Sequence, residues 1–239
     1  MQKIQLRKSN SEIFILAIMA VTGILITVTG IIFKQSFIRI LPLYVSLAIA
    51  LMQSRVSRYA SLIGGFNAIL YAITYGYYHL YASMVYAILV SCPLQIITFV
   101  LWSKKPWKNS TIFRRLTAKQ RIVMILVSLI LWVTICSVLE KTSANHSMLD
   151  TAITILGVIA TILTMLSYIE YTAVMLISQA CSIYLYILML GEVPEQVTYL
   201  IYSVYALVCT SMAFVRTQKI YRYQQTELTE NNSKLAAEV

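Results

Sequence analysis

The sequence predicts an all-α integral membrane protein with about eight transmembrane helices. Hydrophobic residues make up 59% of the 239-residue chain, charged residues make up 12%, and the mean hydropathy is +0.75. A soluble domain carries about 25% charged residues and cannot bury so much apolar surface. Most of the apolar runs are about 20 residues long, which is the length an α-helix needs to cross a bilayer. No linker rich in Gly or Pro divides them, so we predict one membrane domain over residues 13–215.

Four apolar runs lie in the first half of the chain. They occupy residues 13–33, 40–52, 59–75 and 81–102. The first run follows a basic segment, residues 1–12, and this order is also typical of a signal peptide. Because the run is long and no small-residue cleavage site follows it, we favour a transmembrane helix.

Four further apolar runs lie in the second half, at residues 122–139, 151–167, 171–190 and 197–215. The interior loop at residues 103–121 holds seven basic side chains. Such a loop between two membrane spans indicates topology, with nucleic-acid binding as the alternative reading. The polar tail at residues 216–239 is expected to fray beyond Gln224.

The distribution of basic residues predicts the orientation in the membrane. An even number of spans places both chain ends on one side, and all but three of the 19 lysines and arginines lie there. The exceptions are Lys34, Arg39 and Lys141. The positive-inside rule then places both termini in the cytoplasm of a multi-pass protein of the cell membrane. The net charge of +10 reflects this topology and attraction to anionic lipid, and it requires no nucleic acid.

Two stretches of the chain resemble each other, residues 57–102 and residues 170–214. Tyr171 corresponds to Tyr59, and Gln179 corresponds to Asn67. Either Tyr202 or Tyr199 corresponds to Tyr86. Two copies of one helical unit, each with a polar side chain at mid-span, predict a protein that binds a polar solute between the copies.

The predicted spans offer little chemistry beyond hydrogen bonding. Their interiors carry no evident Asp, Glu, Lys or Arg, which proton- and voltage-driven machines usually need. No HExxH, GxSxG, P-loop or TVGYG-like motif occurs, and the four cysteines lack metal-ligand spacing. We therefore predict no enzymatic activity, no cofactor and no metal. An uncharged polar cavity suits passive movement of a neutral or weakly charged solute.

Polar and aromatic side chains at mid-span are the candidate substrate-binding residues. They are Asn67, Tyr71, Tyr86, Gln95, Thr172, Met175, Gln179 and Tyr202. Helical spacing places Asn67 with Tyr71 on one face, and Thr172, Met175 and Gln179 on another. The alternative is that the amides join helices and the tyrosines pack the core. Other tyrosines, Tyr171 among them, are predicted to lie at the membrane interfaces.

Three short motifs resemble the PnuC-type vitamin transporters. They are Asn67-Ala-Ile-Leu-Tyr71, Pro93-Leu-Gln95, and Trp102 with Lys104-Lys105 directly after it. The similarity runs through the spans from Ile40 to Phe214. It implies a 3+1+3 parallel repeat, the plan of the SWEET sugar transporters. The two three-helix bundles would be residues 40–102 and 151–215, with a linker helix at 122–139 and an extra N-terminal helix at 13–33.

The resemblance also implies a cargo and a mechanism. Family members import nicotinamide riboside, and relatives take thiamine, riboflavin or deoxynucleosides. They work by facilitated diffusion, and a cytosolic kinase traps the product. We expect the vitamin or nucleoside, the cytosolic kinase and the lipid bilayer as partners. The sequence does not decide whether the protein forms a homo-oligomer.

One departure weakens the assignment of the cargo. The nicotinamide riboside members carry a Trp-x-x-Trp pair just after a Glu, whereas here Glu170 precedes Tyr171, and Thr172 and Met175 are the nearest positions. The glycine expected before Trp102 is Thr98. Nicotinamide riboside ranks first as the commonest cargo, ahead of another vitamin or a nucleoside. A membrane receptor or scaffold without cargo and an integral membrane enzyme are the other function classes.

Overall fold

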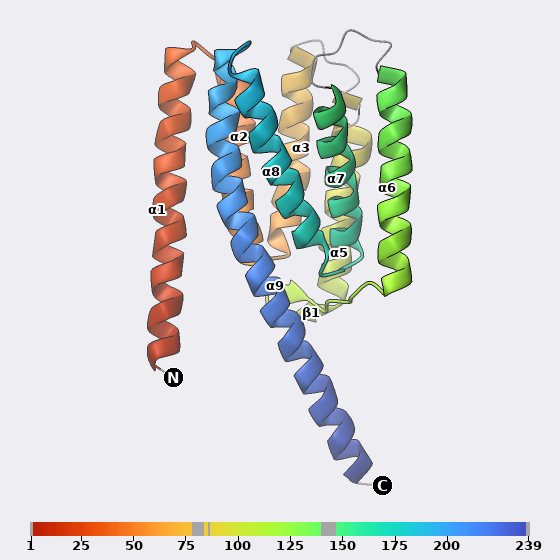
Figure 1. Ribbon diagram of the computed structural model, residues 1–239. Helices are drawn as coiled ribbons and strands as arrows, with labels where there is room; N and C mark the ends of the chain where they lie inside the picture. Colours follow the sequence, from red (N-terminus) through yellow and green to blue (C-terminus); the bar gives the residue numbers. More distant parts are fainter. Residues whose placement is uncertain (1, 78–83, 86, 140–146, 238–239) are drawn as a thin grey trace.

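The computed structural model is a bundle of long helices (Figure 1). It describes residues 2–77, 84–85, 87–139 and 147–237, with side chains described for residues 12–77, 84–85, 87–137 and 148–229. The helices are α1 (Gln2–Ile32), α2 (Phe37–Ser54), α3 (Tyr59–Tyr77), α5 (Cys92–Lys104), α6 (Ala118–Leu139), α7 (Ser147–Met165), α8 (Tyr171–Met189) and α9 (Val197–Ala237). A π-helical turn, η1 (Ala87–Ser91), leads into α5, and a 3₁₀ turn, η2 (Pro194–Gln196), leads into α9.

The all-α membrane fold predicted from the sequence is confirmed. Seven helical segments of the described residues are long and apolar enough to cross a membrane. The eighth predicted span, α3, is not among the seven although it carries no charge, because its tyrosines, glycines and Asn67 lower its hydropathy. The apolar runs therefore located the helices, although α1 begins well before its run, α9 continues well beyond its run, and α5 begins only at Cys92.

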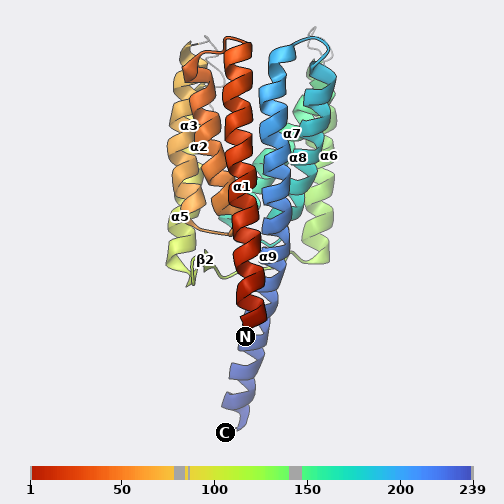
Figure 2. The same cartoon turned by 90° about the vertical axis from the view of Figure 1, so that its left-hand side faces the viewer.

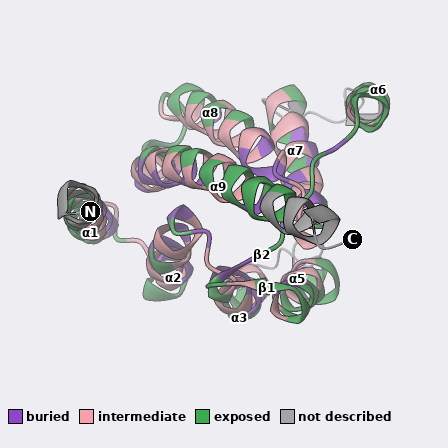
Figure 3. Ribbon diagram, turned by 90° about the horizontal axis from the view of Figure 1, so that it is seen from below, coloured by how far each residue is buried: buried purple, intermediate pink, exposed green. Residues whose placement is uncertain are grey.

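Two groups of helices build the bundle. Helix α3 packs between α2 and α5, and α8 packs between α7 and α9. The two groups meet where α2 contacts α9 and where α5 contacts α7. Seen from below, α1 and α6 stand at opposite sides of the bundle (Figure 3). The parallel 3+1+3 repeat and its domain limits stay predictions.

A proline in α2 illustrates how the bundle satisfies its backbone. Pro42 has no N–H group, so the carbonyl oxygen of Ile38, four residues earlier, loses its helical donor. The hydroxyl of Thr74 in α3 donates to this oxygen at 2.9 Å. In lipid an unsatisfied carbonyl is costly, and a hydroxyl on a neighbouring helix is a usual remedy. This bond therefore fixes α3 against α2.

Helix α9 is one element from the membrane to Ala237, and this corrects the tail expected to fray beyond Gln224. Figures 1 and 2 show it extending well past the other helices, at the end of the bundle where α1 begins. We call this the terminal end, and the opposite one the distal end. Gln224 is buried there: its Oε1 accepts from the backbone N of Phe113 at 3.0 Å, and its Nε2 donates to the carbonyl oxygen of Thr111 at 2.9 Å. These bonds tie the helix to the interior loop.

The interior loop folds back over the terminal end. It contains a short antiparallel hairpin, β1 (Pro106–Trp107) with β2 (Ser110–Thr111). Glu170 holds the loop, because its carboxylate accepts from the backbone N of Leu116 at 3.2 Å and pairs with Arg121 at 2.7 Å. The loop is thus a fixed part of the protein, which basic composition alone does not predict.

Candidate functional site

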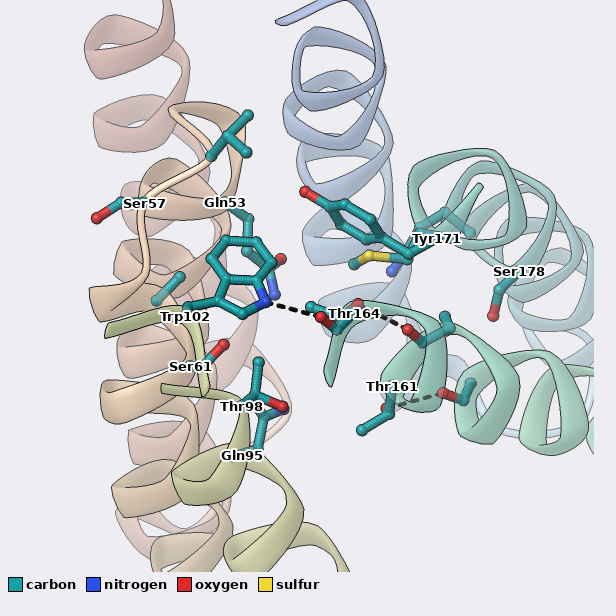
Figure 4. Close-up of a pocket in the computed structure, with 16 residues that line it drawn as sticks. Gln53, Ser57, Ser61, Gln95, Thr98, Trp102, Thr161, Thr164, Tyr171 and Ser178 are labelled. Carbon is teal, nitrogen blue, oxygen red and sulfur yellow. Dashed lines mark hydrogen bonds between the residues drawn. The ribbon is translucent and has the colours of Figure 1, made fainter. Parts of the chain in front are cut away.

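A cavity of about 220 Å³ lies between the two helix groups (Figure 4). Its lining includes residues at the ends of α2 and α5 and at the start of α8, so it lies nearer to the terminal end. On one side its polar lining comes from the end of α2, the start of α3 and from α5: Gln53, Ser57, Ser61, Gln95 and Thr98. On the other side it comes from α7 and α8: Thr161, Thr164, Ser178 and Gln179. Among the described residues, no charged side chain lines it. The cavity therefore offers hydrogen bonds without a fixed charge.

Three of the residues predicted from the sequence meet at this cavity, namely Gln95, Met175 and Gln179. In the described part of the chain, the side-chain amides of Gln53, Gln95 and Gln179 form no hydrogen bond with protein. Each glutamine amide offers two N–H donors and one carbonyl acceptor. These free groups can therefore bind a polar solute from both halves of the chain.

Gly64 of α3 makes room for Gln95. A Cβ atom at Gly64 would lie 3.1 Å from both Cδ and Oε1 of Gln95, which is closer than most real Cβ contacts. A side chain at this position would push the amide of Gln95 away from α3 by a few tenths of an ångström. Gly64 thus positions the amide although it offers no polar group of its own.

Three aromatic rings pack together at the terminal end, and two of them, Trp102 and Tyr171, line the cavity. Trp102 from α5 meets Phe113 of the interior loop edge-on, with ring centroids 5.6 Å apart, and meets Tyr171 at 6.3 Å. Phe113 and Tyr171 stack at 6.2 Å. All three side chains are buried, and we call them the aromatic floor. The prediction that Tyr171 lies at the membrane interface is therefore wrong, because the interior loop covers it.

Asn67, Tyr71 and Tyr202 lie outside the cavity lining, in a second polar cluster. Asn67 is buried and donates from Nδ2 to the hydroxyl of Ser46 in α2 at 2.8 Å. The hydroxyl of Tyr71 lies 3.5 Å from the same oxygen, and Tyr202 also interacts with Ser46. The Oδ1 atom of Asn67 is buried with no hydrogen-bond partner in the described structure. This cluster joins α2, α3 and α9, as the interhelical alternative supposed.

Of the two remaining predicted residues, Thr172 is described and is not among the residues that line the cavity. Its side chain is fully buried, and its hydroxyl donates to the carbonyl oxygen of Ile169. Tyr86 lies outside the described residues. Gln53, Ser61, Thr98 and Ser178 line the cavity but were missed. A signal existed for Thr98 and Ser178, since helical spacing or adjacency relates them to Gln95 and Gln179.

Contacts at the distal end join the two helix groups. Arg39 at the start of α2 pairs with Glu195 of η2 at 2.6 Å, and its guanidinium lies 5.6 Å from the ring centroid of Tyr199. Gln35 donates to the carbonyl oxygen of Glu195 at 3.0 Å and to the hydroxyl of Thr198 at 3.1 Å. The aromatic floor and these distal contacts thus link the groups on either side of the cavity.

The comparisons with known proteins assign the family. A model described as nicotinamide mononucleotide transporter matches residues 36–216. The chain belongs to the nicotinamide mononucleotide transporter family. The resemblance stated from the sequence is thereby confirmed, and the cavity lies within the matched part of this multi-pass transporter.

A solved structure shares the fold of the transporter. It is described as the crystal structure of the vitamin B3 transporter PnuC, and it superimposes with a TM-score of 0.71 at 17% sequence identity. The match covers 89% of this chain and 92% of the other. A search of curated proteins finds no match. In the described residues no cluster of His, Cys, Asp and Glu is suited to holding a metal ion.

Proposed function

We propose that this transporter imports a vitamin precursor by facilitated diffusion, with nicotinamide riboside as the first candidate. The observation that carries the proposal is the pair of free glutamine amides, Gln95 and Gln179, which come from different helix groups and face one uncharged cavity. Both residues are half-buried and their amides can bind a solute in place of water, with a net gain of about 0.5–1.5 kcal/mol for each hydrogen bond. The solved structure's description as a vitamin B3 transporter supports this class of cargo.

The lining favours a nucleoside over a mononucleotide. A phosphate group needs cationic partners, and no Lys or Arg lines the cavity among the described residues. A carboxamide and ribose hydroxyls match the glutamine amides as donors and acceptors. The pyridinium ring of nicotinamide riboside is a cation, which the face of Trp102 or Tyr171 can attract by about 0.5–2 kcal/mol. Riboside therefore fits the residues better than its phosphate ester.

The same lining supports movement without coupling to an ion gradient. Coupled transporters usually keep ionisable side chains along the ion path, and the described lining contains none. Net import then needs a sink, which a cytosolic kinase provides by phosphorylating the product. The basic residues at the terminal end support a cytoplasmic location for both chain ends.

Ligand-dependent melting of the detergent-purified protein tests the cargo. We expect nicotinamide riboside at 100 times its dissociation constant to stabilise the fold by about 2.7 kcal/mol. Nicotinamide mononucleotide is the matched control, and thiamine, riboflavin and deoxynucleosides complete the panel. Stabilisation by one of these others alone would transfer the assignment to that cargo. No stabilisation by any of them would favour the receptor or scaffold alternative.

Counterflow in liposomes tests the mechanism separately. With the stabilising ligand on both sides, labelled ligand should accumulate transiently without any ion gradient or membrane potential. A strict requirement for sodium or for a proton gradient would refute facilitated diffusion while leaving the cargo in place.

A further inference from the structure

An apolar groove of about 660 Å³ runs between α6 and α7, on the far side of α7 from the substrate cavity. Its walls include Val127, Leu131 and Ile135 of α6, and Ile155, Val158 and Ile162 of α7. It reaches from Lys119 to Ile135, roughly 24 Å of helix at 1.5 Å per residue. That is most of the ~30 Å hydrocarbon thickness of a bilayer.

Helix α6 is attached near both ends and open between them. At the terminal end, Arg121 pairs with Glu170 at 2.7 Å, next to the start of α8. Farther along, the indole Nε1 of Trp132 donates to the carbonyl oxygen of Met148 at 3.0 Å, at the start of α7. Between these two attachments most α6 side chains stay exposed, and Figure 3 shows the helix standing apart from the bundle. The groove thus runs along a helix that is attached to the bundle at Arg121 and at Trp132.

The hydroxyl groups in the groove already have hydrogen-bond partners and do not need a polar ligand. Ser128 donates its hydroxyl to the carbonyl oxygen of Met124 at 2.6 Å, and Thr154 donates to that of Asp150 at 2.9 Å. Both hydroxyls are satisfied within their own helices, and Gln120 accepts from the backbone N of Thr117 at 2.9 Å. Apart from Lys119, the other lining residues are apolar. A vitamin or nucleoside would leave its own hydrogen-bonding groups unpaired there. A hydrocarbon chain has no such groups.

The mouth of the groove at the terminal end carries a free positive charge. Lys119 lines the groove and is exposed, and in the described part of the chain it forms no ion pair. The nearby Arg121 is already engaged by Glu170. An amphiphile with a hydrocarbon chain and an anionic head group therefore complements the slot and its mouth together.

We propose that the groove binds an anionic phospholipid, with one acyl chain between α6 and α7 and the head group against Lys119. Transfer of a chain from bulk lipid into an apolar groove gains little, because lipid tails are as apolar as the walls. Selection among lipids rests on the head group. One basic residue near anionic lipid contributes about 1 kcal/mol, which is about a fivefold preference.

Native mass spectrometry of the full-length protein tests the proposal, using an equimolar mixture of phosphatidylglycerol and phosphatidylcholine. We expect a retained phosphatidylglycerol adduct, lowered about fivefold in Lys119→Ser. Lys219→Ser removes an equal charge from exposed α9 at the same end and should retain the adduct. Val127→Phe fills the groove and should remove the adduct, whereas Val133→Phe, the same change outside the groove on α6, should not. Val158→Phe fills it from α7 if Val127→Phe fails to fold.

Several outcomes would overturn the proposal. Equal retention of the two lipids would show that the groove takes bulk lipid without selection. Equal losses in Lys119→Ser and Lys219→Ser would place the head group elsewhere. An adduct that survives the groove-filling variants would place the lipid elsewhere. The same spectra report assembly, so an oligomer that dissociates in Val127→Phe but not in Val133→Phe would make a second copy of the chain the occupant.

Discussion

The indole Nε1 of Trp102 donates a hydrogen bond to the carbonyl oxygen of Thr164 at 2.7 Å, and this bond crosses from α5 to the end of α7 (Figure 4). Trp102 is buried, and its ring is also part of the aromatic floor. The side chain of Trp102 therefore provides both a hydrogen bond and ring packing at the point where the two helix groups touch. Any movement that opens the cavity toward the terminal end has to separate them.

Trp102→Phe is expected to loosen the aromatic floor. It keeps an aromatic ring but removes the donor to Thr164, at a cost of about 0.5–1.5 kcal/mol in the free energy of unfolding. A cysteine introduced at Ser178 in the cavity should then react faster with a polar thiol reagent added from the terminal side. Trp107→Phe is the matched control, because this half-buried indole lies outside the aromatic floor and makes a long 3.4 Å contact with Glu227 of α9. Its ring also lies 4.8 Å from the ammonium group of Lys108, a contact that phenylalanine keeps. Equal labelling rates in the two variants would contradict the role of Trp102.

The ion pair between Arg39 and Glu195 is expected to stabilise the distal contacts by up to about 1 kcal/mol. The side chains are 22% and 42% exposed, so solvent screens the pair. A double-mutant cycle with Arg39→Gln and Glu195→Gln, read by thermal melting, should give a coupling energy of that size. Arg39→Lys should keep the ion pair. Additive single effects would show that the pair contributes nothing measurable.

Topology can be tested by cysteine labelling in intact cells. We propose that the terminal end is cytoplasmic, because the basic residues collect there. A cysteine placed at Glu192, in the turn before η2, should react with an impermeant reagent added outside. A cysteine at Lys108, in the hairpin of the interior loop, should react only after the cells are permeabilised. Reaction at Lys108 in intact cells would reverse the orientation.

The sequence located the helices well because a membrane span depends on local composition, and every apolar run except the last, which lies within the longer α9, ended within two residues of a helix end. It also identified Gln95 and Gln179, because an uncharged amide at mid-span needs a partner. Asn67 shares these properties, yet it binds Ser46 across the α2–α3 contact. The way α2 crosses α3 decides which face is buried, and periodicity within α3 does not contain that information.

The aromatic floor could not be predicted from the sequence for a similar reason. Phe113 belongs to a basic loop, and its place depends on Gln224, which lies more than 100 positions later in the chain. Tyr171 stands at the start of a span, where an interfacial tyrosine is typical. Its burial comes from the folded loop above it. Long-range contacts of polar segments leave no periodic pattern in the chain.

Gly64→Ala is expected to lower ligand affinity without unfolding the protein. The new Cβ would lie 3.1 Å from the amide of Gln95, so this amide has to move. The helix itself gains slightly from alanine, by about 1 kcal/mol at an exposed site. Gly23→Ala is the control, since its Cβ would meet Leu47 at an ordinary 3.8 Å. If Gly64→Ala binds as well as Gly23→Ala, the position of the Gln95 amide does not matter for binding.

The final prediction separates the cavity from the second polar cluster. We propose that Gln95→Ala and Gln179→Ala weaken binding, because each removes a free amide that faces the solute. A lost partner costs about 1–3 kcal/mol, which lowers affinity by roughly five- to two-hundred-fold at ~1.4 kcal/mol per decade. Because those amides hold no protein partner in the described structure, the melting temperature without ligand should stay nearly unchanged.

Asn67→Ala is expected to show the reverse pattern. Its Nδ2 bond to Ser46 joins α2 to α3, so its loss should lower the melting temperature while the affinity of the folded protein changes little. Tyr71→Leu should likewise lower the melting temperature and change the affinity little, because the hydroxyl of Tyr71 lies 3.5 Å from the hydroxyl of the same serine. Melting and ligand titration on the same preparations give both quantities. Should Asn67→Ala lose affinity while keeping its melting temperature, the unpartnered Oδ1 of Asn67 would have to accept a bond from the solute, and the site would extend from the cavity to the second cluster.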